Sequence, residues 1–197
     1  MAKWLAILTL LTANPFWDST DVQQWSEEQL LDFFGNSPWS QTAEAVTGRD
    51  GILTFLATAK PVQNAEREQR RRRMKKIAGV DTVQDPAWDE FQEFLERDIS
   101  RYIVLAVAIP VEATRDGSEM SLMENQSVLK LGKQKIKMSG YFPPSSTDPF
   151  TRLIFPRAGT ENAKELIFEL FLPGTGTPYR QAFYPRKLMT YRGRLEM

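Results

Sequence analysis

The sequence predicts an α+β protein: a mainly antiparallel sheet with an inserted helical pair and a short N-terminal helix. Two charged segments with helical spacing of apolar residues lie between the apolar runs 51–59 and 102–110. Short alternating segments separated by turn residues then follow in the second half of the chain. With 197 residues, of which 42% are hydrophobic and 25% charged, the chain is long enough to bury one core.

The first 13 residues have the pattern of a signal peptide. Lys3 precedes the apolar run 4–11, which is too short to span a bilayer, and the small residue Ala13 precedes a polar segment that contains proline. The alternative is a buried first strand or helix. We expect residues 1–13 to be a signal peptide and the product to be exported, so that it is periplasmic or extracellular.

Residues 14–40 are predicted to form a tryptophan-rich helix and its connection to a single α+β domain over 41–197. Ser26 and Gln29 have the spacing of a capping box, and Gly35 followed by a proline ends the helix. The side chains predicted to hold this helix against the domain are Trp25, Leu30, Phe33, Phe34 and Trp39.

The two inserted helices carry opposite charges. Residues 64–78 include seven basic and two acidic residues, a local charge of +5, whereas residues 85–101 include two basic and six acidic residues, a local charge of −4. Asp85 before Pro86 has the position of an N-cap. Because the connection is short enough for antiparallel docking, we expect the helical pair 64–99 to neutralise its own charge.

The remaining regular elements are predicted to be strands. The apolar run 103–109 is typical of a central strand that is covered on both faces. A polar loop is predicted from there to about Gln126. The later strands are predicted to form an antiparallel meander and cover 127–131, 134–141, 151–155, 165–172, 179–184 and 187–196.

Composition excludes several classes of enzyme. The chain contains no histidine and no cysteine, which eliminates Ser-His-Asp and Cys-His sites, zinc motifs, iron-sulfur clusters and disulfides. Carboxylate-only and lysine-based mechanisms survive this test. The formal net charge is zero, so no global field attracts nucleic acid or an anionic membrane. We predict no catalytic residue, no cofactor, no metal ligand and no nucleic-acid partner.

Three motif-like segments have simpler explanations. The spacing of Glu90, Glu93 and Glu96 is that of a solvated helix face rather than a metal site. The segment 127–130 matches Ser-x-x-Lys, but in a strand its serine and lysine would point to opposite faces. The segment 173–178 is predicted to be a turn, because no Gly-Lys-Ser/Thr follows it.

One basic cluster remains as the candidate binding surface. Three interpretations are open: contact with phosphates or anionic surface polymers, a localisation signal, or a solvated face that the acidic helix neutralises. We favour neutralisation, because the signs of the two helices match. The residues of the cluster are Arg70, Arg71, Arg72, Arg73, Lys75 and Lys76.

Several segments together resemble an uncharacterised family of exported proteins abundant in acidobacteria. They follow the order of the family's elements: the short helix ending in Ser-Pro-Trp, the Pro-Val-x-x-Ala segment, the apolar strand ending in proline, Phe-Pro-Arg and the terminal Met-x-Tyr-x-Gly-Lys/Arg-Leu-Glu. Here they are Phe16-Trp17, 25–31, 37–40, 59–65, 102–110, 155–157 and 187–196. The resemblance implies export and brings no activity, ligand or catalytic residue.

The function predicted from these observations is that of an exported interaction or structural protein without catalysis. One alternative is a cell-wall or polysaccharide binding module, since exposed Trp17, Trp25 and Trp39 would stack on sugars. A carboxylate-only hydrolase is a further alternative and would need two acidic side chains that converge in a cleft. The partner would be an anionic or polysaccharide surface, and no transmembrane span is predicted.

Overall fold

The computed structural model describes residues 15–45, 51–80, 84–110, 113, 116–145 and 147–197. The predicted signal peptide therefore lies outside the described residues. The described helices are α1 Phe16–Ser19, α2 Glu27–Asn36, α3 Lys60–Ala78, α4 Pro86–Asp98 and α5 Gly117–Gln126. The strands are β1 Ser40–Ala45, β2 Gly51–Leu56, β3 Tyr102–Ala108, β4 Val128–Leu131, β5 Gln134–Lys137, β6 Gly140–Phe142, β7 Phe150–Pro156, β8 Glu165–Phe171, β9 Tyr179–Pro185, β10 Thr190–Tyr191 and β11 Arg194–Leu195.

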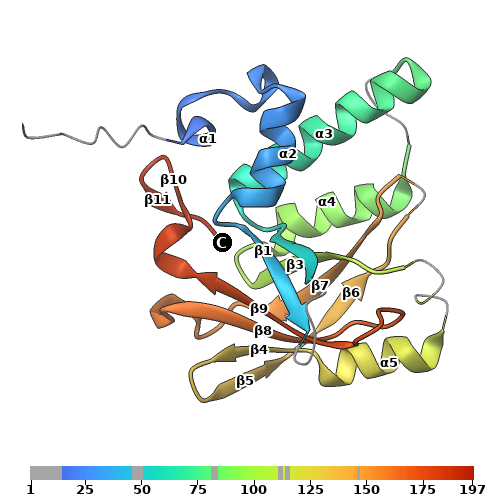
Figure 1. Ribbon diagram of the computed structural model, residues 1–197, viewed down its shortest axis with the longest axis vertical. Coiled ribbons are helices and arrows are strands. Elements are labelled where there is room, and N and C mark those ends of the chain that lie inside the picture. Colours follow the sequence, from blue (N-terminus) through green and yellow to red (C-terminus); the bar gives the residue numbers. More distant parts are fainter. Residues whose placement is uncertain (1–14, 46–50, 81–83, 111–112, 114–115, 146) are drawn as a thin grey trace, which may run out of the picture.

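The predicted α+β class is confirmed, because these elements form a large antiparallel sheet with helices packed around it (Figure 1). The strand order is β5-β4-β8-β9-β1-β2-β3-β7-β6, and β10 and β11 form a separate hairpin. Helices α2, α3 and α4 lie together on one side, and α5 lies apart from them (Figure 1). The helical pair α3–α4 is inserted between β2 and β3, as predicted.

The sheet curls until its two ends meet. Its edge strands β5 and β6 are consecutive in the chain, and the two residues between them continue the pairing on both sides. The Met138 N–H donates to the Ser127 carbonyl at 3.4 Å, next to β4, and the Ser139 N–H donates to the Ile154 carbonyl of β7 at 2.8 Å. One bent segment therefore pairs with both ends of the sheet.

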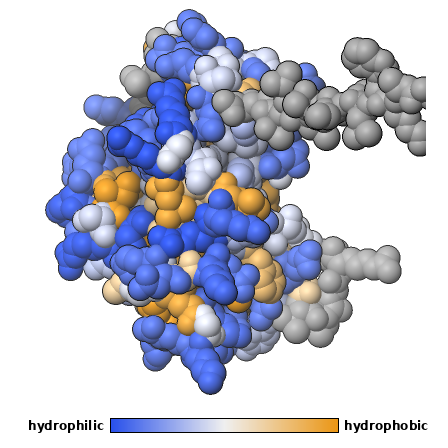
Figure 2. All heavy atoms as spheres, turned by 90° about the vertical axis from the view of Figure 1, so that its left-hand side faces the viewer, coloured by the Kyte–Doolittle hydropathy of each residue, from blue (hydrophilic) through white to orange (hydrophobic). Residues whose placement is uncertain are grey.

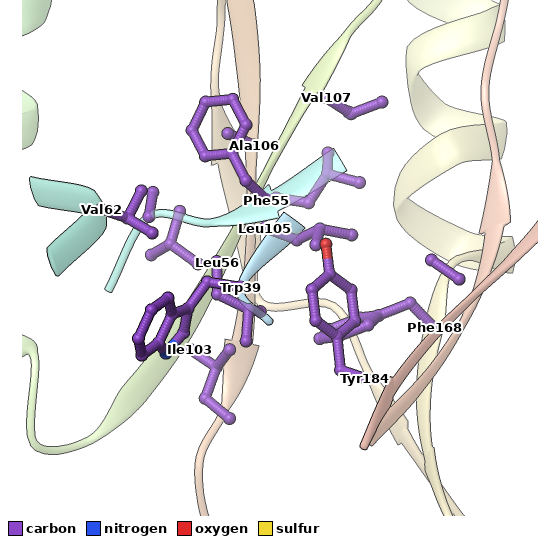
Figure 3. Close-up of a cluster of buried hydrophobic side chains, with 14 of the residues drawn as sticks. Trp39, Phe55, Leu56, Val62, Ile103, Leu105, Ala106, Val107, Phe168 and Tyr184 are labelled. Carbon is purple, nitrogen blue, oxygen red and sulfur yellow. The ribbon is translucent and has the colours of Figure 1, made fainter. Parts of the chain in front are cut away.

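The inner face of the curled sheet holds the core. Side chains from β3, β8 and β9 face one another there, including the fully buried Leu105, Phe168 and Tyr184 (Figure 3). The rings of Phe168 and Tyr184 meet edge to face, with centroids 5.6 Å apart. The Tyr184 hydroxyl lies 2.7 Å from Thr54 Oγ1, so the buried polar atom has a partner.

The N-terminal helix α2 has the cap that the sequence predicts. Ser26 Oγ accepts a hydrogen bond from the Gln29 N–H at 3.0 Å, and Gln29 Oε1 accepts one from the Ser26 N–H at 2.8 Å. The helix runs to Asn36, one residue past the predicted end. All five side chains predicted to hold it against the domain are buried: Trp25, Leu30, Phe33, Phe34 and Trp39.

The charged helices also follow the prediction, with one difference in length. Helix α3 begins at Lys60 instead of residue 64, because Pro61 lies in its first turn, where the missing N–H removes no hydrogen bond. Asp85 caps α4 by accepting from the Trp88 N–H at 3.3 Å. Every residue of α3 after Met74 is exposed, and this end of the helix projects from the molecule (Figure 1).

Three predictions of secondary structure are wrong. Residues 40–45, predicted as connection and domain start, form β1, which pairs with β2 and β9. The predicted polar loop before Gln126 contains α5, which Asp116 caps and whose Met120 and Met123 are buried. The predicted strand over 187–196 is a turn of 3-10 helix followed by the short β10–β11 hairpin, because the chain reverses at two residues of positive φ.

Candidate functional site

Half of the residues of the predicted basic surface bind partners within the protein. Arg70 Nη2 lies 3.3 Å from Asp85 Oδ2, and its Nη1 donates to Thr147 Oγ1 at 2.6 Å. Arg71 and Arg72 both bind Glu68 on their own helix, at 2.8 Å and 2.6 Å. These hydrogen bonds, that from Arg71 first, lower the pKa of Glu68.

Arg72 also connects α3 to the N-terminal segment. Its Nη2 donates to the Trp25 carbonyl at 2.7 Å, and its Nη1 lies 3.4 Å from Glu27 Oε1 on α2. The guanidinium therefore joins two elements far apart in the sequence. Contacts of this kind fix the position of the helix, and they leave Arg72 with little capacity for an external partner.

The other half of the basic surface is exposed on the projecting end of α3. Arg73, Lys75 and Lys76 have no ion pair or side-chain hydrogen bond with the residues that the structure describes. The exposed apolar side chains Ile77 and Val80 follow them directly, with 73% and 45% of their surface accessible. Lys75 and Lys76 also stand in the last turn, where cations are favourable to the helix dipole.

The acidic helix α4 contributes only part of the neutralisation that its charge suggests. Asp85 pairs with Arg70, and Gln92 Oε1 accepts from Arg67 Nε at 3.0 Å. Asp98 instead pairs with Arg97 and Arg101. The other acidic side chains of the helix, Asp89, Glu90, Glu93 and Glu96, are exposed, and within the described part of the chain no group of three or more acidic side chains is arranged to hold a metal ion.

A buried ionic cluster lies between α3, α4 and β7. Arg152 is 1% exposed, and its Nη2 lies 2.5 Å from Glu66 Oε1. Its Nη1 bonds to Asp148. The guanidinium also stacks on aromatic rings of α4, with its central carbon 4.3 Å from the Phe91 centroid and 5.2 Å from that of Trp88. The cluster therefore places one cation between two carboxylates.

Burial sets the protonation of this cluster. Desolvation raises the pKa of Glu66 to about 7, although Arg152 opposes the shift, and the nearby charge of Asp148 raises it further. Burial also acts to raise the pKa of Asp85, but hydrogen bonds from Thr147 and Ser145, with the Trp88 N–H and Arg70, lower it to about 2. Glu66 is thus the carboxyl whose protonation changes near neutral pH.

Glu66 and Asp148 are two carboxyl groups that share one partner, Arg152, but there is no space for a substrate beside them. The cavity beside them measures about 20 Å³, which is close to the volume that one water requires. A sugar ring does not fit there. The pair consequently holds Arg152 in position, and the cavity that it lines is too small for a substrate.

The three tryptophans that suggested polysaccharide binding belong to the core. Trp25 and Trp39 are 4% and 0% exposed, and Trp17 packs on Phe33 and Trp39 with centroids 5.9 Å and 6.5 Å away. The indole of Trp39 donates to the Glu196 carbonyl at 2.9 Å. Trp25 and Trp39 are therefore not available for sugar stacking, and Trp17 is partly buried against the core.

Sequence reasoning did not indicate the groove at one end of the sheet. A groove of about 670 Å³ opens where β8 begins and β9 ends, beside the β10–β11 hairpin. Its basic lining residues are Lys164, Arg186 and Lys187; the first two are 22 residues apart in the chain, so the three do not form a motif. The available signal in the sequence was the position of these basic residues, one just before the predicted strand 165–172 and two just after the predicted strand 179–184.

Comparisons with protein families, curated proteins and solved structures find no match to this chain. No described helix is both long and apolar enough to cross a membrane.

Proposed function

We propose that the protein is an exported, non-catalytic binding protein and that the projecting end of α3 contacts an anionic polymer. The observation that carries this proposal is the division of the basic cluster. Arg70, Arg71 and Arg72 are bound to internal partners, whereas Arg73, Lys75 and Lys76 are exposed at the tip of a helix that stands clear of the sheet.

Charge distribution supports an anionic partner for this surface. The chain has no net charge, so attraction of an anionic polymer must come from a local patch. Three cations within four residues supply such a patch, and the adjacent Ile77 and Val80 add apolar contact. A projecting helix end can approach an extended polymer without obstruction from the sheet.

The absence of catalysis is supported by what surrounds the candidate groups. The Glu66–Asp148 pair has a cavity of only about 20 Å³ beside it. The tryptophans, which would favour sugar stacking, are buried in the core or packed against it. An anionic polymer is therefore a better partner for this protein than a neutral polysaccharide.

The polymer contact can be tested with dextran sulfate as probe and uncharged dextran as reference. We expect the double substitution Lys75→Gln and Lys76→Gln to weaken dextran sulfate binding several-fold and to reduce its salt dependence. Glutamine has nearly the helix propensity of lysine, so the fold should be retained. Calorimetry at two salt concentrations measures both effects.

The matched control removes the same charge elsewhere. Lys133 and Lys137 are exposed at the β4–β5 hairpin, and their replacement by glutamine should leave binding unchanged. Equal losses in both double variants would show a nonspecific charge effect. An affinity for dextran sulfate that the α3 substitutions leave unchanged would reject the proposed surface.

Export rests on the sequence of residues 1–13 and on the family resemblance. Mass determination of the product from the periplasm or medium of its own host should give a chain that starts at Asn14. A control with Leu8→Arg, which interrupts the apolar run, should keep the product inside the cell with these residues attached. An intact N-terminus on the periplasmic or secreted product would contradict cleavage.

A further inference from the structure

Strand pairing brings two basic segments together at one end of the sheet. In the β8–β9 register Glu165 is opposite Pro185, and the Arg186 N–H donates to the Lys164 carbonyl at 3.1 Å. The backbone thus fixes Lys164, directly before β8, next to Arg186, directly after β9. Lys187 follows in the 3-10 turn.

The groove at this position has the size and lining of a small-molecule site. Its volume of about 670 Å³ lies in the usual range for ligand pockets. Ala163, Pro185 and Leu195 give it an apolar surface, the last from the β10–β11 hairpin. Figure 2 views the side of the molecule that carries this hairpin and shows hydrophobic patches set among hydrophilic side chains.

The basic side chains of the groove lack internal counterions. Lys164, Arg186 and Lys187 face a single acidic lining residue, Glu165, and none of the four has an ion pair with the residues that the structure describes. This differs from α3 and β7, where Arg70 and Arg152 bind carboxylates. The groove therefore carries an uncompensated positive charge.

Arg186 gives the most direct indication of a ligand. Its Nε is buried, yet no described group accepts its hydrogen bond. A buried donor without an acceptor costs free energy that folding normally avoids. Arg186 also lines the groove, and its planar guanidinium suits a carboxylate or phosphate that accepts two parallel hydrogen bonds.

From these observations we infer that the groove binds a small organic anion, with Arg186 contacting a carboxylate or phosphate group and the apolar lining contacting the rest of the molecule. The site is independent of the proposed function, since it lies at the ends of β8 and β9 and shares no residue with the exposed end of α3. Loss of either activity therefore leaves the other one intact.

Calorimetric titration of the full chain tests the site with three probes: benzoate, phenyl phosphate and the uncharged benzyl alcohol. We expect saturable binding of at least one anion and none of the alcohol. Comparison of benzoate with phenyl phosphate shows which acidic group the site prefers. Inorganic phosphate should bind more weakly than phenyl phosphate, because it makes no contact with the apolar lining.

Substitutions then locate the binding. Arg186→Gln should lower the affinity for the preferred anion by about tenfold or more. Arg186→Lys should retain only part of the affinity, because lysine cannot form the planar pair of hydrogen bonds. The matched control is Arg97→Gln, which removes an exposed arginine of α4 that lies outside both the groove and the exposed end of α3, and it should leave the affinity unchanged.

A second variant protects the test against misfolding. If Arg186→Gln does not fold, the double substitution of exposed Lys164 and Lys187 by glutamine should reduce affinity in the same direction. Failure of both anions to bind the unmodified protein would overturn the inference. So would equal affinities in the unmodified protein and in a folded groove variant.

Discussion

At the scale of single residues, Arg152 shows how an ionic group can be accommodated in a protein interior. Removing a charge from water costs several kcal/mol, and ion pairing returns this only when the geometry is good. Arg152 has two carboxylates, Glu66 and Asp148, and the face of Phe91. With both carboxylates ionised the cluster would be negative, so a proton on Glu66 brings it to neutrality.

The first prediction concerns the pH dependence of stability. The folded-state pKa of Glu66 is about 7 against an ordinary 4.5, so between these values the folded state binds a proton that the unfolded chain does not. The stability contributed by Glu66 is complete below pH 4.5 and is lost as pH rises through about 7. Denaturant unfolding should show this decline.

Glu66→Gln mimics the protonated carboxyl and should abolish that part of the decline. Glu68→Gln is the matched control, because Glu68 lies on the same helix and its pKa is lowered instead. The stability contributed by Glu68 is lost as pH falls, so its removal should preserve the decline towards alkaline pH. A Glu66→Gln variant with the full decline would assign it to another group.

The second prediction concerns Arg152 itself. Arg152→Met leaves two carboxylates buried without their cation, and we expect the free energy of unfolding to fall by about 3–5 kcal/mol at pH 8. Adding Glu66→Gln and Asp148→Asn should restore much of the loss. Arg101→Met removes an exposed partner of Asp98 and should cost about 0–1 kcal/mol. Equal losses for the two single variants would contradict the buried pairing.

At the scale of elements, the turn between β8 and β9 depends on one glycine. Gly174 has φ = 68°, and a Cβ there would lie 2.4 Å from the Cβ of Ala113. Gly176, two residues later, has no atom within 4 Å of its ideal Cβ and no positive φ. The same turn therefore contains a glycine that needs its conformation and one that does not.

The third prediction follows from this contrast. Gly174→Ala should lower the free energy of unfolding by at least about 1–2 kcal/mol through backbone strain, with a further loss from the contact with Ala113. Gly176→Ala should have little effect. Urea unfolding midpoints of the two variants provide the comparison, and equal midpoints would argue against the turn geometry.

Local patterns account for the elements that the sequence predicts correctly. Three such features depend only on residues that are close together in the sequence: the capping box of α2, the N-cap Asp85 of α4 and the apolar run of β3. By contrast, β1 has the sequence Ser-Gln-Thr-Ala-Glu-Ala, with small alanines on its inner face, and it becomes a strand through pairing with β2 and β9. Helix α5 buries only Met120 and Met123.

The same distinction applies to the candidate site. The sequence shows that α3 is basic, but the partners that divide its charges come from other elements. Arg72 contacts Glu27 and the Trp25 carbonyl, and Arg70 contacts Thr147, which is 77 residues away. The groove near Arg186 likewise depends on the β8–β9 register and the final hairpin. Local sequence carries no record of these contacts.

At the scale of the whole molecule, closure of the sheet joins segments that the sequence would assign to separate units. The pairing of Glu44 with Gln181 places the first strand beside one of the last. Trp39 is part of the core that includes Leu105 and Phe168, and its indole bonds to Glu196 near the C-terminus. The tryptophan-rich segment thus shares one continuous core with the strands.

The last prediction tests this continuity through cooperative unfolding. Three of the five tryptophans lie within residues 14–40, so replacing Trp4 and Trp88 by phenylalanine makes fluorescence report on that segment alone. Because those tryptophans pack into the shared core, the fluorescence transition in denaturant should coincide with loss of far-UV circular dichroism. Arg72→Gln, which breaks the contact of α3 with Trp25, should shift both transitions together. If the N-terminal helix were an independent appendage, fluorescence would change at lower denaturant than circular dichroism, and Arg72→Gln would widen the gap.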